Sequence, residues 1–129
     1  MPAPAKSHSL YFVYIIRTSA DTLYTGITTD LSRRWQEHSN SNKGSKYLKA
    51  IRPLEIAAAW EIHPGEKDIQ GASLRSVASK LESRIKSLTR EEKLRLIRRP
   101  STVKRFDCCI EFGCHPIHAS RRKAIQQRV

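Results

Sequence analysis

Long hydrophobic runs and acidic residues are what this sequence most clearly lacks. No apolar stretch approaches the roughly 18 residues that a membrane-spanning helix needs, and the first residues, MPAPAKSHS, lack the apolar stretch of a secretory signal. Asp and Glu number 12 against 24 Lys and Arg, which gives a net charge of +12. We therefore expect a cytoplasmic protein that binds a polyanion, with nucleic acid favoured over a membrane surface.

Cysteine is scarce, and its few positions are clustered. The three cysteines are Cys108, Cys109 and Cys114. An odd count with two adjacent residues does not fit a secreted disulfide framework, so free thiols in a reducing compartment are expected. His115 and His118 lie nearby, and zinc can use such ligands, but the spacing matches no common zinc finger.

Internal repeats are absent, and 129 residues fit one domain of common size. Segments rich in β-branched and aromatic residues predict strands, whereas helical spacing of apolar residues predicts helices. The strands are expected at 10–17, 22–28 and 54–62, and the helices at 30–38, 72–88 and 89–97. The order β-β-α-β-α-α indicates an α+β fold, in which helices pack on a small sheet.

The chain divides into three parts by composition. Residues 1–9 are expected to be a disordered lead, and residues 10–99 the folded domain. Residues 100–129 have short mixed segments, no clear helical period and a basic end, so they are either an extension or a loosely ordered tail. Within the domain, the stretch 39–46 is expected to be a polar, basic loop.

The helix expected at 30–38 has Asp30 as a possible N-cap. At about 100° per residue, Leu31 and Trp35 share the buried stripe, and Arg34 and His38 lie together at its border. Arg33 and Glu37 point well away from that stripe. Arg34 and His38 therefore border either a cleft or plain core, in which case Arg34 only lays its aliphatic stem over the core.

Two tyrosines lie in the first two predicted strands. If their hairpin is centred on Ser19, Tyr14 is directly opposite Tyr24, and a half-residue shift of the centre places the two on opposite faces. The pair is then either a site or a stabilising cross-strand aromatic contact. Gly26 shares the face of Tyr24, and the space left open there suits the close approach of a backbone or a ligand.

One acidic residue borders the apolar stripe of the helix expected at 72–88. Glu82 follows the buried-stripe residue Leu81, and Lys86 lies one turn later. Glu82 is therefore either a site residue or half of a surface ion pair with Lys86.

Together these residues resemble the GIY-YIG nuclease family, most of all its small stand-alone bacterial members. The first motif half is "VYI" within "YFVYII", and the second is "YTG". The segments "DLSRRWQEH", "LESRIKSL" and "TREEKLRLI" follow in the family's order, so that the resemblance covers about residues 10–97. It implies a three-stranded antiparallel sheet flanked by helices, and hydrolysis of DNA phosphodiesters with one divalent ion, Mg²⁺ or Mn²⁺.

The resemblance also implies site residues. It implies that the catalytic residues are Tyr14, Tyr24, Arg34 and His38, and that Glu82 is the metal ligand. We also expect Gly26, Lys43 and Lys46 to contact nucleic acid. A phenolate at Tyr24 can accept a proton from water, Arg34 offers a donor fork to phosphate, and Tyr14 can orient water or Tyr24. For His38, phosphate contact, proton transfer and orientation all stay open.

The sequence departs from the family pattern in places. Phe12 and Val13 stand for the glycine and isoleucine of the first motif, and Thr25 is the middle of the second. Ile27 stands where some members carry a lysine, so His38 or a lysine of the "NKGSK" loop is expected to supply the missing charge. The resulting prediction is a metal-dependent DNA endonuclease, set in DNA repair or recombination. The alternative is a non-catalytic nucleic-acid-binding module on the same fold.

Overall fold

The computed structural model describes residues 10–40, 52–63, 71–109 and 113–127. Lys43 and Lys46 lie outside these ranges. The strands are β1 (Tyr11–Thr18), β2 (Leu23–Thr28), β3 (Pro53–His63) and β4 (Gly113–Pro116). The helices are α1 (Leu31–Asn40), α3 (Gly71–Lys86), α4 (Arg90–Arg98) and α5 (Ala119–Gln127), with two 3₁₀ turns, η2 (Pro100–Arg105) and η3 (Asp107–Cys109).

The sheet has four antiparallel strands in the order β2-β1-β3-β4, so the expectation of three strands is wrong. The missed strand is β4, which pairs with β3 from Trp60 opposite Pro116 to His63 opposite Gly113. Its sequence, GCHP, contains a glycine and a proline, which are depleted in strands. Its pairing with β3 therefore comes from tertiary packing rather than from local preference.

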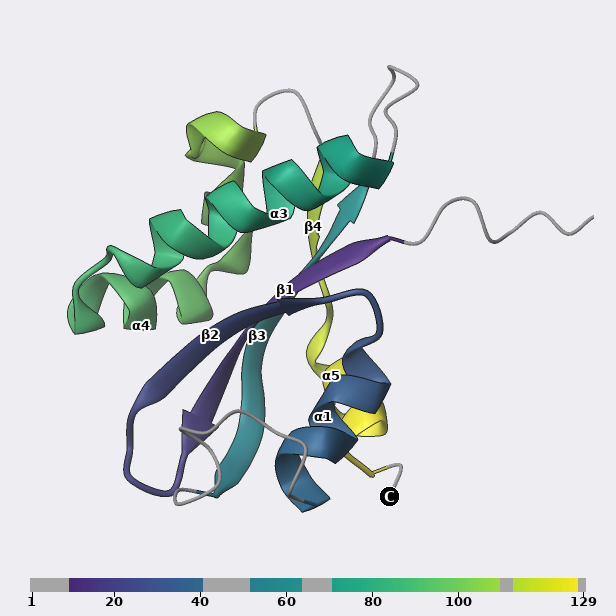
Figure 1. The fold of residues 1–129 in the computed structure, drawn as a ribbon. Helices are drawn as coiled ribbons and strands as arrows, with labels where there is room; N and C mark the ends of the chain where they lie inside the picture. The colour runs from purple at the N-terminus through teal and green to yellow at the C-terminus, as the bar shows by residue number, and fades with distance from the viewer. Residues whose placement is uncertain (1–9, 41–51, 64–70, 110–112, 128–129) are drawn as a thin grey trace, which may run out of the picture.

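Helices cover both faces of the sheet (Figure 1), with α3 and α4 on one side and α1 and α5 on the other. The residues of β1 alternate between the two cores. Val13 and Ile15 face the α3 core, and Tyr14 and Ile16 face the α1 and α5 core. This strand is buried on both faces. Polar groups on it are therefore held in fixed positions.

The sequence signals for helix starts are confirmed. Asp30 accepts a hydrogen bond on its Oδ1 from the Arg33 backbone N–H at 3.0 Å, which caps α1. Thr89 and Glu92 form a capping box at the start of α4. Leu31 and Trp35 are both buried, as the spacing predicts.

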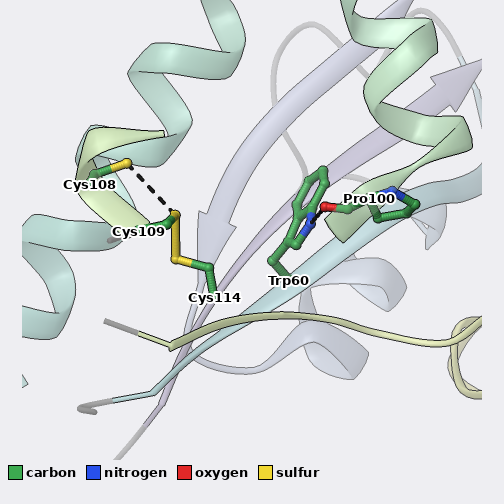
Figure 2. Close-up of a disulfide and its surroundings, with 5 residues drawn as sticks. All are labelled: Trp60, Pro100, Cys108, Cys109 and Cys114. Carbon is green, nitrogen blue, oxygen red and sulfur yellow. Dashed lines mark hydrogen bonds between the residues drawn. A yellow bond between two sulfur atoms is a disulfide. The ribbon is translucent and has the colours of Figure 1, made fainter. Parts of the chain in front are cut away.

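Residues beyond Pro100 pack against the domain. The Trp60 indole donates to the Pro100 carbonyl at 2.9 Å, and a disulfide joins Cys109 to Cys114 (Figure 2). The expectation of free thiols is therefore wrong for these two residues, while Cys108 is a free cysteine. The sequence did not indicate this disulfide between residues five positions apart, because only the pairing of β4 with β3 brings Cys114 into the core.

The last helix, α5, is fastened to the sheet by side-chain hydrogen bonds. Arg122 donates to the carbonyls of Ile56 and Ile117 at 3.1 and 2.7 Å. Gln126 accepts from the Ile56 backbone N–H at 2.7 Å. These bonds meet backbone groups next to the register shift between β1 and β3. In the described ranges, no helix is long and apolar enough to cross a membrane.

Candidate active site

Gly26 is required by the ring of Tyr14. The register places Tyr14 opposite Gly26 and Ile16 opposite Tyr24, so the two tyrosines share a face but lie on a diagonal rather than directly opposite. A Cβ atom at Gly26 would lie 2.5 Å from the Tyr14 hydroxyl oxygen and 2.7 Å from the ring carbon that carries it. The open space expected beside Gly26 is therefore filled by Tyr14, and that expectation is corrected.

Tyr14 and His38 form a buried hydrogen-bonded pair. The Tyr14 hydroxyl lies 3.0 Å from Nε2 of His38, and the two residues are 1% and 3% exposed. Burial is the largest effect on both groups. It raises the pKa of Tyr14 to about 12, against a hydrogen bond from Arg34, and lowers the pKa of His38 to about 4. Both side chains are therefore neutral at neutral pH.

Arg34 is a second partner of the Tyr14 hydroxyl. Arginine can only donate, so the Tyr14 oxygen accepts from Arg34, and it also lies within hydrogen-bond distance of Nε2 of His38. Tyr14 is thus a neutral phenol with both sides of its oxygen occupied.

Tyr24 completes a cluster of three rings. Its ring centroid lies 6.4 Å from that of Tyr14 and 5.6 Å from that of His38, with a tilted and an edge-on arrangement respectively. Tyr24 is only half-buried, unlike its two neighbours. It is therefore the phenol of the cluster that solvent or a ligand can reach.

Arg34 is held by a carboxylate that the sequence interpretation placed elsewhere. Nη1 of Arg34 lies 2.8 Å from Oε1 of Glu37, and Arg33 contacts the same carboxylate at 3.9 Å. Burial acts to lower the pKa of Arg34, but hydrogen bonds to Glu37 and Tyr14 outweigh it and raise that pKa. Glu37 does not point away from the site. The signal for it was the spacing of three residues from Arg34, which lets long side chains meet.

Glu82 lies on α3 and forms the ion pair with Lys86 that its spacing predicts, at 3.5 Å. Its side chain is 23% exposed. The charge of Glu82 is also near enough to contribute to the raised pKa of Tyr14, although burial is the larger cause. The ion-pair interpretation of Glu82 is therefore confirmed, and its role as a site residue stays a prediction.

A lone carboxylate fits a magnesium-type ion. Among the described residues, no group of three or more His, Cys, Asp or Glu side chains is placed to hold a metal. Mg²⁺ commonly uses one or two carboxylates, with water and substrate phosphates filling its other positions. Glu82 supplies such a carboxylate, and its neighbour Lys86 is exposed and can move aside. The donor set therefore suits an ion that arrives with a phosphate substrate, and not a preformed protein cage.

The structure thus brings together most of the expected site residues. The rings of Tyr14, Tyr24 and His38 form a cluster, and Arg34 is hydrogen-bonded to Tyr14. The charge of Glu82 adds only a small contribution to the raised pKa of Tyr14. Gly26 is present as the residue that admits Tyr14. Lys43 and Lys46 lie outside the described residues, so their expected contacts with nucleic acid stay predictions.

Comparisons with known proteins give a family and relatives for this chain. The family described as the GIY-YIG catalytic domain matches residues 10–95. A UPF0213 protein of Klebsiella pneumoniae is 42% identical over 87 residues, which cover 67% of this chain and 72% of that protein. A UPF0213 protein of Citrobacter koseri is 41% identical over 87 residues, covering 67% and 76%. No solved structure matches the chain.

Proposed function

The chain belongs to the GIY-YIG family, and from this premise we propose that it is a metal-dependent endonuclease that hydrolyses DNA phosphodiester bonds. A nuclease-type activity on DNA is what the family implies. One observation carries the more specific proposal. The half-buried phenol of Tyr24 stands beside a buried, neutral Tyr14–His38 pair, with Arg34 and Glu82 acting on the same cluster.

In this proposal Tyr24 accepts the proton of the attacking water. Its accessibility supports the role, because a general base must come within hydrogen-bond reach of the proton that it takes. The water oxygen bonds to phosphorus as its proton passes to Tyr24, and the bond from phosphorus to the leaving sugar oxygen breaks. In this step Tyr24 reacts as its phenolate. Arg34, which is hydrogen-bonded to Tyr14 in the same cluster, supplies a positive charge there in place of the lysine that some family members carry at the position of Ile27.

Tyr14 and His38 are proposed as positioning residues. Tyr14 has its oxygen occupied by Arg34 and His38, and its raised pKa keeps it protonated. It therefore cannot take a proton from water at neutral pH. Its ring and that of His38 instead contact the ring of Tyr24 and fix its position. This assignment chooses orientation among the roles that the sequence left open for His38.

Arg34 is proposed to bind the non-bridging oxygens of the reacting phosphate. Guanidinium groups present a planar donor fork that matches phosphate geometry. The 2.8 Å bond to Glu37 holds that fork in place and leaves other N–H groups available. Preorganised donors of this kind stabilise the negative charge that builds up in the transition state.

Glu82 is proposed to hold one Mg²⁺ or Mn²⁺ ion. When bound, such an ion offsets negative charge on the phosphate oxygens. The partly exposed carboxylate supports this role, since water can fill the remaining coordination positions. We place the protein in the cytoplasm and in DNA repair or recombination as part of the same proposal.

The rival function is a nucleic-acid-binding module without catalysis. The net charge of +12 suits a binder as well as an enzyme. A pure binder, however, has no use for a carboxylate next to its phosphate site, because Glu82 would repel the ligand. The presence of Glu82, whose charge contributes to the raised pKa of Tyr14, therefore favours the enzyme.

The test is cleavage of end-labelled single-stranded, duplex and branched DNA with Mg²⁺, with Mn²⁺ and with EDTA. Wild type is compared with Glu82→Gln, and Glu91→Gln is the matched control, because Glu91 is an exposed acid on α4. We expect metal-dependent cutting that falls about 10²–10³-fold in Glu82→Gln, since a catalytic metal contributes several kcal/mol.

The control variant should cut at the wild-type rate. Absence of cutting on every substrate, with salt-sensitive DNA binding intact in all three proteins, would contradict the enzyme and support the binding module. If metal-dependent cutting persists in Glu82→Gln, Glu82 is not the metal ligand.

A further inference from the structure

A basic groove lies between α3, α4 and η2. Its volume is about 490 Å³. An adjoining hollow of about 400 Å³ shares Arg84 and Phe106 with it and extends the surface to Lys80, Arg105 and one acid, Asp107. The groove is lined by Arg84, Leu88, Glu92, Arg95, Leu96, Arg98, Arg99, Thr102 and Phe106.

The cations of this groove have few partners. Within the described part of the chain, Arg95, Arg98 and Arg99 form no ion pair and no side-chain hydrogen bond, and all three are exposed. Glu92 is the one acid in the lining of the groove. Its carboxylate already accepts a hydrogen bond from the Thr89 backbone N–H in the capping box. Several like charges that face one hollow repel each other, so an anion bound there relieves that repulsion.

The floor of the groove is apolar. Leu88, Leu96 and Phe106 lie between the arginines, and the guanidinium carbon of Arg84 lies 4.9 Å from the centroid of the Phe106 ring. A guanidinium stacked on a ring keeps its N–H groups in its own plane, free for phosphate oxygens. The groove therefore combines an apolar surface with donors for phosphate.

The groove and the ring cluster lie on different faces of the sheet. The groove is formed by α3, α4 and η2, and α3 packs on the face of Val13 and Ile15. Tyr14 belongs to the core of the opposite face, which α1 and α5 cover. On α3 itself, Arg84 and Glu82 lie on opposite flanks of the buried Leu81 at about 100° per residue. The two surfaces are therefore separate.

We propose that this groove is a second nucleic-acid contact that holds an unpaired strand while the ring cluster acts on a separate part of the same molecule. The inference rests on the proposed function for the identity of its ligand. An unpaired strand fits best because its bases can reach an apolar floor while its phosphates meet the arginines. Intact duplex offers mainly its outer phosphates, and inorganic phosphate has no apolar part.

The experiment measures binding in EDTA, so that its outcome does not depend on cleavage. The probes are a fluorescent single strand of about 12 nucleotides and a duplex of the same length, titrated between about 50 and 200 mM salt. The groove variant is Arg95→Gln/Arg98→Gln/Arg99→Gln. The matched control, Arg52→Gln/Arg75→Gln/Lys123→Gln, removes the same charge from exposed residues outside the groove. Melting temperatures establish that both variants fold.

The proposal predicts that the groove variant binds the single strand at least tenfold more weakly than the control does. Its slope of log affinity against log salt should also be smaller by about 2, as expected when roughly three contacts at about 0.7 each are lost. Duplex binding should weaken equally in both variants. Equal loss of single-strand affinity in both variants would overturn the proposal.

Two further results would also overturn the proposal. One is a groove-specific loss that is confined to the duplex, or to inorganic phosphate measured by its effect on melting temperature. The other is groove-specific loss of binding to anionic phospholipid vesicles with DNA binding unchanged, which would make the surface a membrane contact. Loss of cleavage alone would bear on the proposed function and leave this binding result standing.

Discussion

The two faces of the sheet treat polar groups in opposite ways. On the face covered by α1 and α5, Tyr14 and His38 are buried within the core and bonded to each other. On the face covered by α3, the core is apolar apart from Thr25, whose buried Oγ1 has no hydrogen-bond partner among the described residues. The cations of the basic groove lie outside this core. Buried polar groups must be held by partners, since leaving one unsatisfied is costly. Substitutions on the first face should therefore change stability and rate, and those in the groove should change affinity.

A large effect that separates the two regions is expected at Arg34. Arg34→Lys keeps the charge but loses the planar fork and the 2.8 Å bond to Glu37. We expect single-turnover cleavage to fall about 10²–10³-fold, as for the loss of one preorganised donor. Affinity for DNA, measured by fluorescence anisotropy in EDTA, should change far less.

Arg33→Lys is the matched control for this substitution. Arg33 is the preceding residue, its side chain is 59% exposed, and its contact with Glu37 is long. It should cut at the wild-type rate. Equal losses in the two variants would mean that bulk charge, not the held fork of Arg34, drives the reaction.

The buried pair should also make stability depend on pH. The pKa of His38 is about 4 in the folded protein and about 6.5 in an unfolded chain. Between these values the unfolded chain binds more protons, so the free energy of unfolding falls as the pH falls from about 6.5 towards 4. The shift corresponds to a loss of up to about 3 kcal/mol, complete below pH 4.

Denaturant unfolding at several pH values measures this loss. His38→Gln should flatten the dependence in this range, because the titrating group is gone. His115→Gln is the control, since His115 is exposed on β4, and it should keep the wild-type dependence. If His38→Gln kept the wild-type dependence of stability on pH, this result would contradict the assignment of His38 as a buried neutral imidazole.

A smaller effect is expected from Gly26→Ala. The new Cβ would meet the Tyr14 hydroxyl at 2.5 Å, and Tyr14 cannot move aside because it is packed and bonded to His38. Overpacking of this kind lowers the free energy of unfolding by about 1–3 kcal/mol. Urea denaturation measures the change.

Gly113→Ala offers a direct comparison with Gly26→Ala. There the new Cβ would also come within 2.5 Å of a side-chain atom, Nε2 of His115, but that ring is exposed and can rotate away. We expect a loss under about 0.5 kcal/mol, typical of a surface position. Equal losses at the two glycines would show that Tyr14 is not fixed.

Much of the fold could be predicted because its signals are local. The β-branched runs, the Asp30 cap and the capping box at Thr89 all act within a few residues. The strand β4 and the Cys109–Cys114 disulfide could not be predicted, because both depend on contacts made across the sheet. The basic groove was missed for the same reason, since α3, α4 and η2 must pack before its lining converges.

The site was predicted less completely. Helical spacing placed Arg34 beside His38, and strand alternation allowed Tyr14 and Tyr24 to share a face. Strand alternation could not fix the register of β1 against β2, which places Tyr14 opposite Gly26. The angle along α1 pointed Glu37 away, but the length of its side chain brings the carboxylate back to Arg34. Register and side-chain reach are properties of the packed structure.

The most direct test of the account compares the two tyrosines by single-turnover cleavage in Tyr24→Phe and Tyr14→Phe. The account predicts that Tyr24→Phe loses about 10²–10⁴ in rate, as for a general base, with little change in unfolding. We expect Tyr14→Phe to lose about tenfold in rate and to be destabilised by about 1–3 kcal/mol, because His38 is left without its buried hydrogen-bond partner. A loss of rate in Tyr14→Phe as large as that in Tyr24→Phe, or full activity in Tyr24→Phe, would contradict it.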